Sequence, residues 1–186
     1  EKARDAYGRS LEIKPSRQAY TNFGLLYYYQ GRFADCADMQ TKALEYASED
    51  HRVWGRLADC YRFIPDTESE AWKAFQRAAE LAQENLEINQ EDWMTRGQLG
   101  LYLSRIDQPE RALSELEQAL KESDQNPEML YLMALVKLSL GEQAEVLSLL
   151  ERAVTAGSDY RRFIEADPDL QSLRNKKAFT ELLPPA

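Results

Sequence analysis

Hydrophobic positions recur at helical spacing along almost the whole chain, and no segment shows a sustained alternation of apolar and polar residues. This pattern predicts an all-α fold without strands. Successive helices are expected to form pairs joined by short turns. The expected helices cover residues 1–14, 16–30, 33–48, 50–63, 67–89, 91–105, 109–123, 127–140, 142–156, 159–166 and 168–183.

Proline and glycine mark the ends of these helices. Each of the seven prolines falls at an expected helix boundary or in the tail, where its missing N–H does no harm. Gly31 and Gly141 stand in turns between paired helices. Gly24 and Gly100 stand inside helices, where glycine costs about 1 kcal/mol. We therefore expect Gly24 and Gly100 where the two helices of a pair approach most closely.

The helical pattern repeats along the chain. Each expected second helix contains a small residue followed by an aliphatic or small one, and successive pairs of this kind lie 33, 35, 41 and 34 residues apart. The pairs are Ser10-Leu11, Ala43-Leu44, Ala78-Ala79, Ala119-Leu120 and Ala153-Val154. The longer step is explained by residues 71–89, which contain no Gly or Pro and predict a longer second helix, and by an extra turn over 62–66.

Further positions recur in register with these pairs. In the expected first helices they are Phe23-Gly24-Tyr27, Trp54-Leu57-Ala58-Tyr61, Leu99-Gly100-Leu103 and Met133-Ala134. In the second helices they are Cys36-Gln40-Ala43, Ala71-Phe75-Ala78, Ala112-Leu116-Ala119 and Val146-Leu150-Ala153. The set resembles the tetratricopeptide repeat. Gln40 at an aromatic position and Lys137 in place of a Tyr depart from that family's pattern.

The resemblance implies a right-handed superhelical solenoid of antiparallel helix pairs. We expect one solenoid domain over residues 1–186, with about four full repeats, an N-terminal half repeat and a C-terminal capping helix. The expected divisions are 1–15 (half repeat), 16–49, 50–90, 91–125 and 126–158 (repeats) and 159–186 (cap).

A narrower resemblance concerns two segments. Residues 54–65 and 165–183 are similar to repeats found C-terminal to kinase, cyclase or DNA-binding modules in bacterial signalling proteins. This implies the docking or sensory arm of a larger regulator. The chain begins with Glu1 and not with Met, so we interpret it as a fragment of a longer protein.

Composition excludes several classes of function. Hydrophobic residues make up 44% and charged residues 30% of the chain, which is typical of a globular protein. The net charge of −9 argues against a nucleic-acid or anionic-membrane partner, because phosphate binding needs clustered Lys and Arg. No apolar run approaches a membrane span. The compartment stays open, with the cytoplasm slightly favoured over the soluble part of a membrane-anchored protein.

Chemical motifs are not found in the sequence. It contains no Gly-rich phosphate loop, nucleophile elbow or H-E-x-x-H, so we predict no catalysis and no cofactor. One histidine, His51, cannot complete a zinc set with two cysteines. Cys36 and Cys60 are expected to be small buried thiols, with a disulfide between them as the alternative.

In the tetratricopeptide architecture the first helices line a concave groove. Helical spacing predicts its lining residues as Leu25, Tyr28, Tyr29, Arg52, Asp59, Arg62, Phe63, Leu101, Arg105, Tyr131, Leu135 and Leu138. Aromatics and Arg dominate binding hot spots, and Arg grips carboxylates. We therefore predict a protein or peptide partner with apolar anchors and an acidic group. Tyr28 or Tyr29 should be exposed, because adjacent helix residues point about 100° apart, whereas Tyr27, Trp54 and Tyr61 should pack in the core.

Two other functions remain open. The half repeat leaves the apolar face with Tyr7 and Leu11 unpartnered, so the open N-terminal end could mediate homo-oligomerisation. A third possibility is a sensor that closes on a small ligand in the groove.

Overall fold

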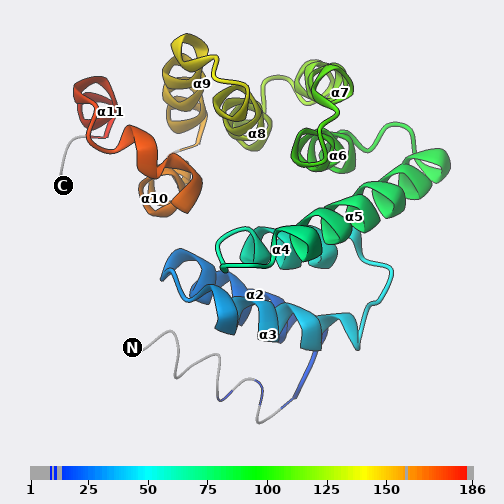
Figure 1. Ribbon diagram of the computed structural model, residues 1–186. Coiled ribbons are helices and arrows are strands. Elements are labelled where there is room, and N and C mark those ends of the chain that lie inside the picture. The colour runs from blue at the N-terminus through cyan, green and yellow to red at the C-terminus, as the bar shows by residue number, and fades with distance from the viewer. Residues whose placement is uncertain (1–8, 10, 12–13, 158, 184–186) are drawn as a thin grey trace. The chain divides into compact units, whose positions relative to one another are not determined.

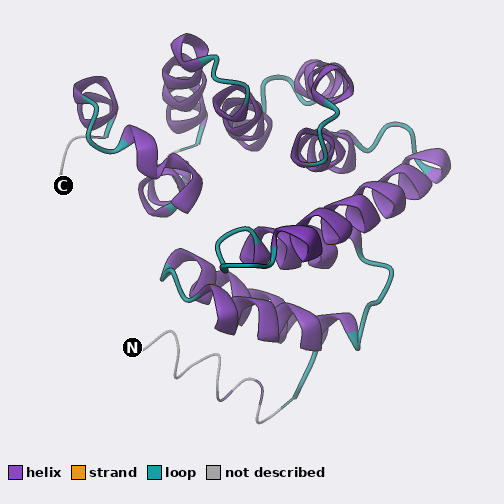
Figure 2. Cartoon of the chain, viewed as in Figure 1, coloured by secondary structure: helices purple, strands orange, loops and turns teal. Residues whose placement is uncertain are grey.

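The computed structural model describes residues 9, 11, 14–157 and 159–183. All regular structure within these residues is helical, as Figure 2 shows, which confirms the all-α class. None of the described helices combines the length and the apolar character of a membrane span. The elements in Figure 1 are α2 (Arg17–Tyr29), α3 (Phe33–Leu44), α4 (His51–Tyr61), α5 (Glu68–Ile88), α6 (Trp93–Arg105), α7 (Pro109–Glu122), α8 (Pro127–Ser139), α9 (Gln143–Ala156), α10 (Tyr160–Ala166), the 3-10 helix η1 (Pro168–Leu173) and α11 (Lys177–Leu182).

Side-chain caps mark the starts of the first helices of the pairs. Ser16, Asp50, Asp92 and Asn126 precede α2, α4, α6 and α8, and each side chain accepts a hydrogen bond from a backbone N–H two or three residues further on. Such a cap contributes about 1 kcal/mol to helix stability. The four helices that carry the predicted recognition residues therefore each begin at a residue fixed by the sequence.

Two glycines lie at tight contacts between paired helices. α2 packs against α3, and α6 packs against α7. A Cβ atom at Gly24 would lie 2.3 Å from Nε2 of Gln40. At Gly100 it would lie 2.6 Å from Cγ of Leu116 and 2.9 Å from the carbonyl oxygen of Ala112. These distances show close helix contacts at both glycines, as predicted, although the flexible amide of Gln40 could move aside whereas the backbone of Ala112 could not.

The two departures from the repeat pattern have local explanations. Gln40 is fully buried beside Gly24, and its Nε2 donates to the carbonyl oxygen of Thr21 at 3.3 Å. Its slender amide fits where an aromatic ring would not. Nζ of Lys137 lies 2.6 Å from Oε2 of Glu142, so this lysine links the two helices across the turn between α8 and α9.

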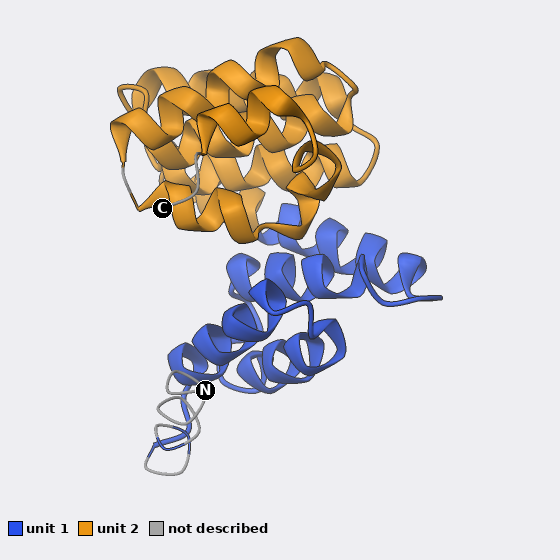
Figure 3. Cartoon of the chain, turned by 90° about the vertical axis from the view of Figure 1, so that its left-hand side faces the viewer, with its two compact units in different colours: residues 1–81 blue, residues 82–186 orange. Residues whose placement is uncertain are grey.

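The chain divides into two compact units, coloured separately in Figure 3. Unit 1 comprises residues 1–81 and unit 2 residues 82–186, so the boundary falls inside the long helix α5. The extra length predicted for this second helix is confirmed, since α5 has 21 residues. In unit 2, α8 also packs against α9, and α9 packs against α10 and α11.

Cys36 of α3 and Cys60 of α4 form a disulfide, which corrects the expectation of two free thiols. Their Cα atoms are 5.8 Å apart, and the residues are only 1% and 0% exposed. The packing of α3 against α4 brings these two helix faces together, which the separation of 24 residues in sequence does not reveal. The bond ties the second helix of one pair to the first helix of the next.

The C-terminal segment is broken where one capping helix over 168–183 was expected. It forms η1 and then the short helix α11. Leu170 and Leu173 are both buried, and residues three apart lie on one face of a 3-10 helix. Nη2 of Arg174 donates to the carbonyl oxygen of Asp167 at 3.1 Å, which closes the turn.

Candidate functional site

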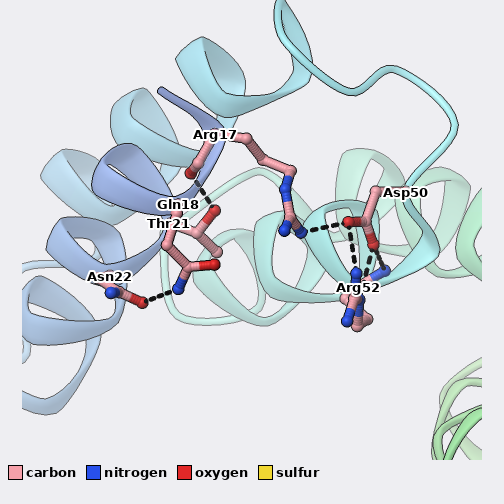
Figure 4. Close-up of polar contacts among 6 residues, drawn as sticks. All are labelled: Arg17, Gln18, Thr21, Asn22, Asp50 and Arg52. Carbon is pink, nitrogen blue, oxygen red and sulfur yellow. Dashed lines mark hydrogen bonds and ion pairs between the residues drawn. The ribbon is translucent and has the colours of Figure 1, made fainter. Parts of the chain in front are cut away.

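Helices α2 and α4 of unit 1 lie beside each other with their N-terminal ends joined by ion pairs. Nη1 of Arg17 lies 2.5 Å, and Nη2 of Arg52 2.9 Å, from Oδ2 of Asp50. In Figure 4 the two guanidinium groups approach the carboxylate from different sides. Asp50 thus fixes the spacing between the first turns of the two helices.

The Asp50 carboxyl group is held in its ionised form. Burial would raise its pKa, but hydrogen bonds from Arg52 and the positive charges of Arg52 and Arg17 outweigh burial and lower the pKa to about 2. Half of the Arg52 side chain is nevertheless exposed. The guanidinium of Arg52 is therefore held in position and still accessible to a partner.

At the other end of the two helices lies an aromatic cluster. The ring of Tyr28 makes edge contacts with Tyr29, Phe33 and Phe63, with centroids 5.5, 5.8 and 6.0 Å apart. Phe33 stacks on Phe63 at 4.6 Å, and the guanidinium of Arg62 lies 5.2 Å from the Phe63 ring centroid. This second contact between the C-terminal ends shows that α2 and α4 run in the same direction.

Tyr28 and Tyr29 differ in their exposure to solvent. Tyr28 is only 8% exposed, because three rings and the core of unit 1 surround it, so the expectation that it lines an open surface is wrong. Tyr29 is half-buried. The predicted core residues also differ, since Tyr27 is buried whereas Trp54 and Tyr61 are partly buried and pack against the core from outside.

We use the term α2–α4 face for the surface residues that these two helices contribute. Arg52 is exposed, and the other members are half-buried. The members are Leu25, Tyr29, Arg52, Asp59, Arg62 and Phe63. Together α2, α4 and their caps contain four arginines and two aspartates, so this region is cationic although the chain carries a net charge of −9.

In unit 2, most of the predicted lining residues on α6 and α8 are buried. Leu101, Tyr131 and Leu135 are buried, and Leu138 is half-buried. The side chain of Arg105 is only 11% exposed. The prediction of exposed lining residues on α6 and α8 is therefore wrong for Leu101, Tyr131 and Leu135, whereas Arg105 and Leu138 are partly exposed.

The C-terminal segment of the chain contacts the polar groups of two of these residues, Arg105 and Tyr131. Nη2 of Arg105 donates to Oδ2 of Asp169 at 2.8 Å, and the hydroxyl of Tyr131 donates to Oδ2 of Asp167. Asp167 also caps η1 by accepting from the backbone N–H of Asp169 at 2.8 Å. Two acidic residues of one turn thus contact α6 and α8.

Tyr160, at the start of α10, adds a further contact to α8. Its hydroxyl lies 3.4 Å from Oε2 of Glu128. Burial raises the pKa of Tyr160, and the negative charge of Glu128 raises it further, so the phenol stays protonated and acts as the donor.

No binding role was predicted from the sequence for Arg17, Asp50, Phe33, Asp167 or Asp169. Asp50 had a usable signal, because an Asp directly before an apolar-periodic segment is typical of an N-cap. The described residues contain no group of three or more His, Cys, Asp or Glu that could hold a metal ion.

The self-assembly hypothesis requires that Tyr7 and Leu11 at the N-terminal end lack a packing partner. Leu11 packs against the core cluster of unit 1. Tyr7, the other residue of that hypothesis, lies outside the described residues. Homo-oligomerisation through this end stays a prediction.

Comparison with known proteins identifies the repeat. The family model for the tetratricopeptide repeat matches residues 21–85 and 98–169. Among solved structures, a thermophilic tetratricopeptide repeat protein of Thermus thermophilus has a TM-score of 0.61 and 20% identity over 88% of each chain. YrrB, described as a repeat protein with an unusual peptide-binding site, has a TM-score of 0.47 and 20% identity over 95% of this chain and 88% of its own. The search of curated proteins gave no match.

Proposed function

The chain belongs to the tetratricopeptide repeat family, and from this premise we propose that it binds an acidic peptide or protein segment on the α2–α4 face. Tetratricopeptide repeats generally mediate protein–protein interaction and act as scaffolds without chemistry of their own. The proposal adds the position of the surface and the chemistry of the partner to that general role.

The observation that carries the proposal is the combination of aromatic rings and arginines on two neighbouring first helices. Tyr29 and Phe63 offer rigid apolar surface. Arg52 and Arg62 are held by ion pairs with Asp50 and Asp59, and a partner carboxylate would add to these pairs or replace them. The Arg17–Asp50 ion pair links α2 to α4, and the disulfide links α4 to α3, so both constraints lower the entropy lost on binding. The excess of arginines over aspartates on α2, α4 and their caps favours an acidic partner.

In this proposal the chain is the docking or sensory part of a larger bacterial signalling protein. The support is the similarity of residues 54–65 and 165–183 to repeats that follow kinase, cyclase or DNA-binding modules. The disulfide adds a preference for an oxidising compartment over the cytoplasm, because disulfides persist where thiols are not kept reduced. Alkylation of free thiols in source cells would test this compartment. Modification of Cys36 or Cys60 would contradict an oxidising compartment.

Peptide-display selection on the full chain tests the function. We expect enrichment of sequences that combine acidic residues with an aromatic or aliphatic anchor. The enriched peptide should lose at least about tenfold in affinity when Tyr29→Ala or Arg62→Ala is introduced, which corresponds to about 1.4 kcal/mol.

Two substitutions outside the α2–α4 face serve as matched controls. Tyr46→Ala removes an aromatic ring that is 52% exposed in the turn after α3, and Arg111→Ala removes an exposed arginine of α7. Both should leave binding unchanged. Failure to enrich any sequence, or equal losses in the controls, would refute the proposed function.

A further inference from the structure

The acidic turn at residues 167–170 contacts unit 2 as a bound peptide would. Asp167 and Asp169 contact α8 and α6, the first helices of successive pairs. Leu170 is fully buried directly after them. These groups have the chemistry predicted from the sequence for a partner of the first helices, namely carboxylates beside an apolar anchor.

The ion pair at this site is partly sheltered from water. The side chains of Arg105 and Asp169 are 11% and 12% exposed, so their attraction is screened less than that of a surface pair. Asp167 is 4% exposed, and its carbonyl oxygen is held by Arg174. A short segment therefore makes a dense set of contacts.

The resident segment does not use all the donors of the site. Nε of Arg105 is buried and has no hydrogen-bond acceptor among the described residues. A buried donor left unsatisfied costs free energy, and a carboxylate can take two donors of one guanidinium. A free peptide with a carboxylate placed for both donors would bind Arg105 better than the tethered Asp169 does.

We propose that α6 and α8 form a second peptide site, specific for the sequence Asp-Pro-Asp-Leu and its acidic analogues, with residues 167–170 as its resident occupant. The site is kept closed because α10 and α11, which flank the occupant in sequence, both pack on α9 and hold it in place. A partner with the same chemistry opens the site by displacing this occupant. The site lies wholly within unit 2 and does not depend on the α2–α4 face.

Binding in trans of a synthetic peptide of residues 165–174 tests the proposal. The variant Asp167→Asn/Asp169→Asn weakens the resident segment and keeps its shape. It should bind the peptide at least about tenfold more tightly than the wild-type chain does. Adding Arg105→Ala should abolish that gain, and a peptide with both aspartates replaced by Asn should not bind.

A second measurement covers the case in which the double variant does not fold. Excess peptide should increase amide hydrogen exchange at Leu170–Leu173 of the wild-type chain. The Asn-substituted peptide should not. Unchanged exchange at these amides, or variant binding that is insensitive to Arg105, overturns the proposal and leaves residues 167–170 as a structural cap only. Substitutions at Tyr29 and Arg62 should not affect either result.

Discussion

The substitution Gly100→Ala tests the close contact between the paired helices α6 and α7. The new methyl group would lie 2.6 Å from Cγ of Leu116 and 2.9 Å from the carbonyl oxygen of Ala112. Leu116 and Ala112 are both fully buried. Since one of the two clashing atoms belongs to the backbone, rotation of a side chain cannot relieve the contact, and α6 and α7 must move apart.

The expected magnitude is a balance of two effects. Overpacking a core costs about 1–3 kcal/mol. Replacing Gly by Ala inside a helix returns about 1 kcal/mol. Because backbone must move, we expect a cost near the upper end and a net destabilisation of about 1–2 kcal/mol. For a chain of this size, that lowers the Tm by roughly 2–8 °C.

Gly97→Ala in the same helix is the matched control. Its methyl group would meet Sδ and Cε of Met129 at 2.2 and 2.9 Å, and the flexible end of a methionine can rearrange. Thermal unfolding followed by circular dichroism should therefore show a smaller loss for Gly97→Ala than for Gly100→Ala. A Gly100→Ala chain as stable as the wild type would refute the close-crossing argument.

Three further predictions concern stability. Asp50→Asn keeps the helix cap but removes the charge, so the variant should be about 1–2 kcal/mol less stable than the wild type at neutral pH. Because the pKa of Asp50 is lowered to about 2, this difference in stability should disappear as the pH falls from about 4 to about 2. A difference that does not change with pH would contradict this. Removing the disulfide with Cys36→Ala/Cys60→Ala should cost about 3 kcal/mol, since the bond closes a loop of 24 residues; an unchanged urea midpoint would argue against it. Arg105→Ala should cost about 2–3 kcal/mol by removing its partly buried ion pair with Asp169, whereas exposed Arg111→Ala should cost less than about 0.5 kcal/mol; equal urea midpoints would count against a contribution from this pair.

The sequence was informative where structure depends on local spacing. Helix ends follow from caps and turn glycines, such as Asn126 before Pro127 and Gly31 and Gly141 with φ of 71° and 79°. The Gly24 and Gly100 crossings follow from the cost of glycine inside a helix. These features depend on residues within a few positions of one another, so one sequence suffices to predict them.

Features that depend on contacts between distant segments could not be predicted. Cys36 and Cys60 each look like an ordinary buried residue until the packing of α3 on α4 brings them together. The position of Asp169 beside Arg105, 64 residues away, depends on a turn that the helical pattern of 168–183 conceals. Leu101, Tyr131 and Leu135 are buried, although their helical spacing is also typical of an exposed recognition surface, and spacing alone does not distinguish the two cases.

Hydrogen-exchange mapping of the full chain with a selected peptide tests the central claim most directly. That claim is that first helices recognise the partner, with the α2–α4 face open and the α6–α8 site held by residues 167–170. We predict that the peptide slows exchange along α2 and α4, near Leu25–Tyr29 and Asp59–Phe63. Slower exchange confined to the second helices α3, α7 and α9 would contradict the claim.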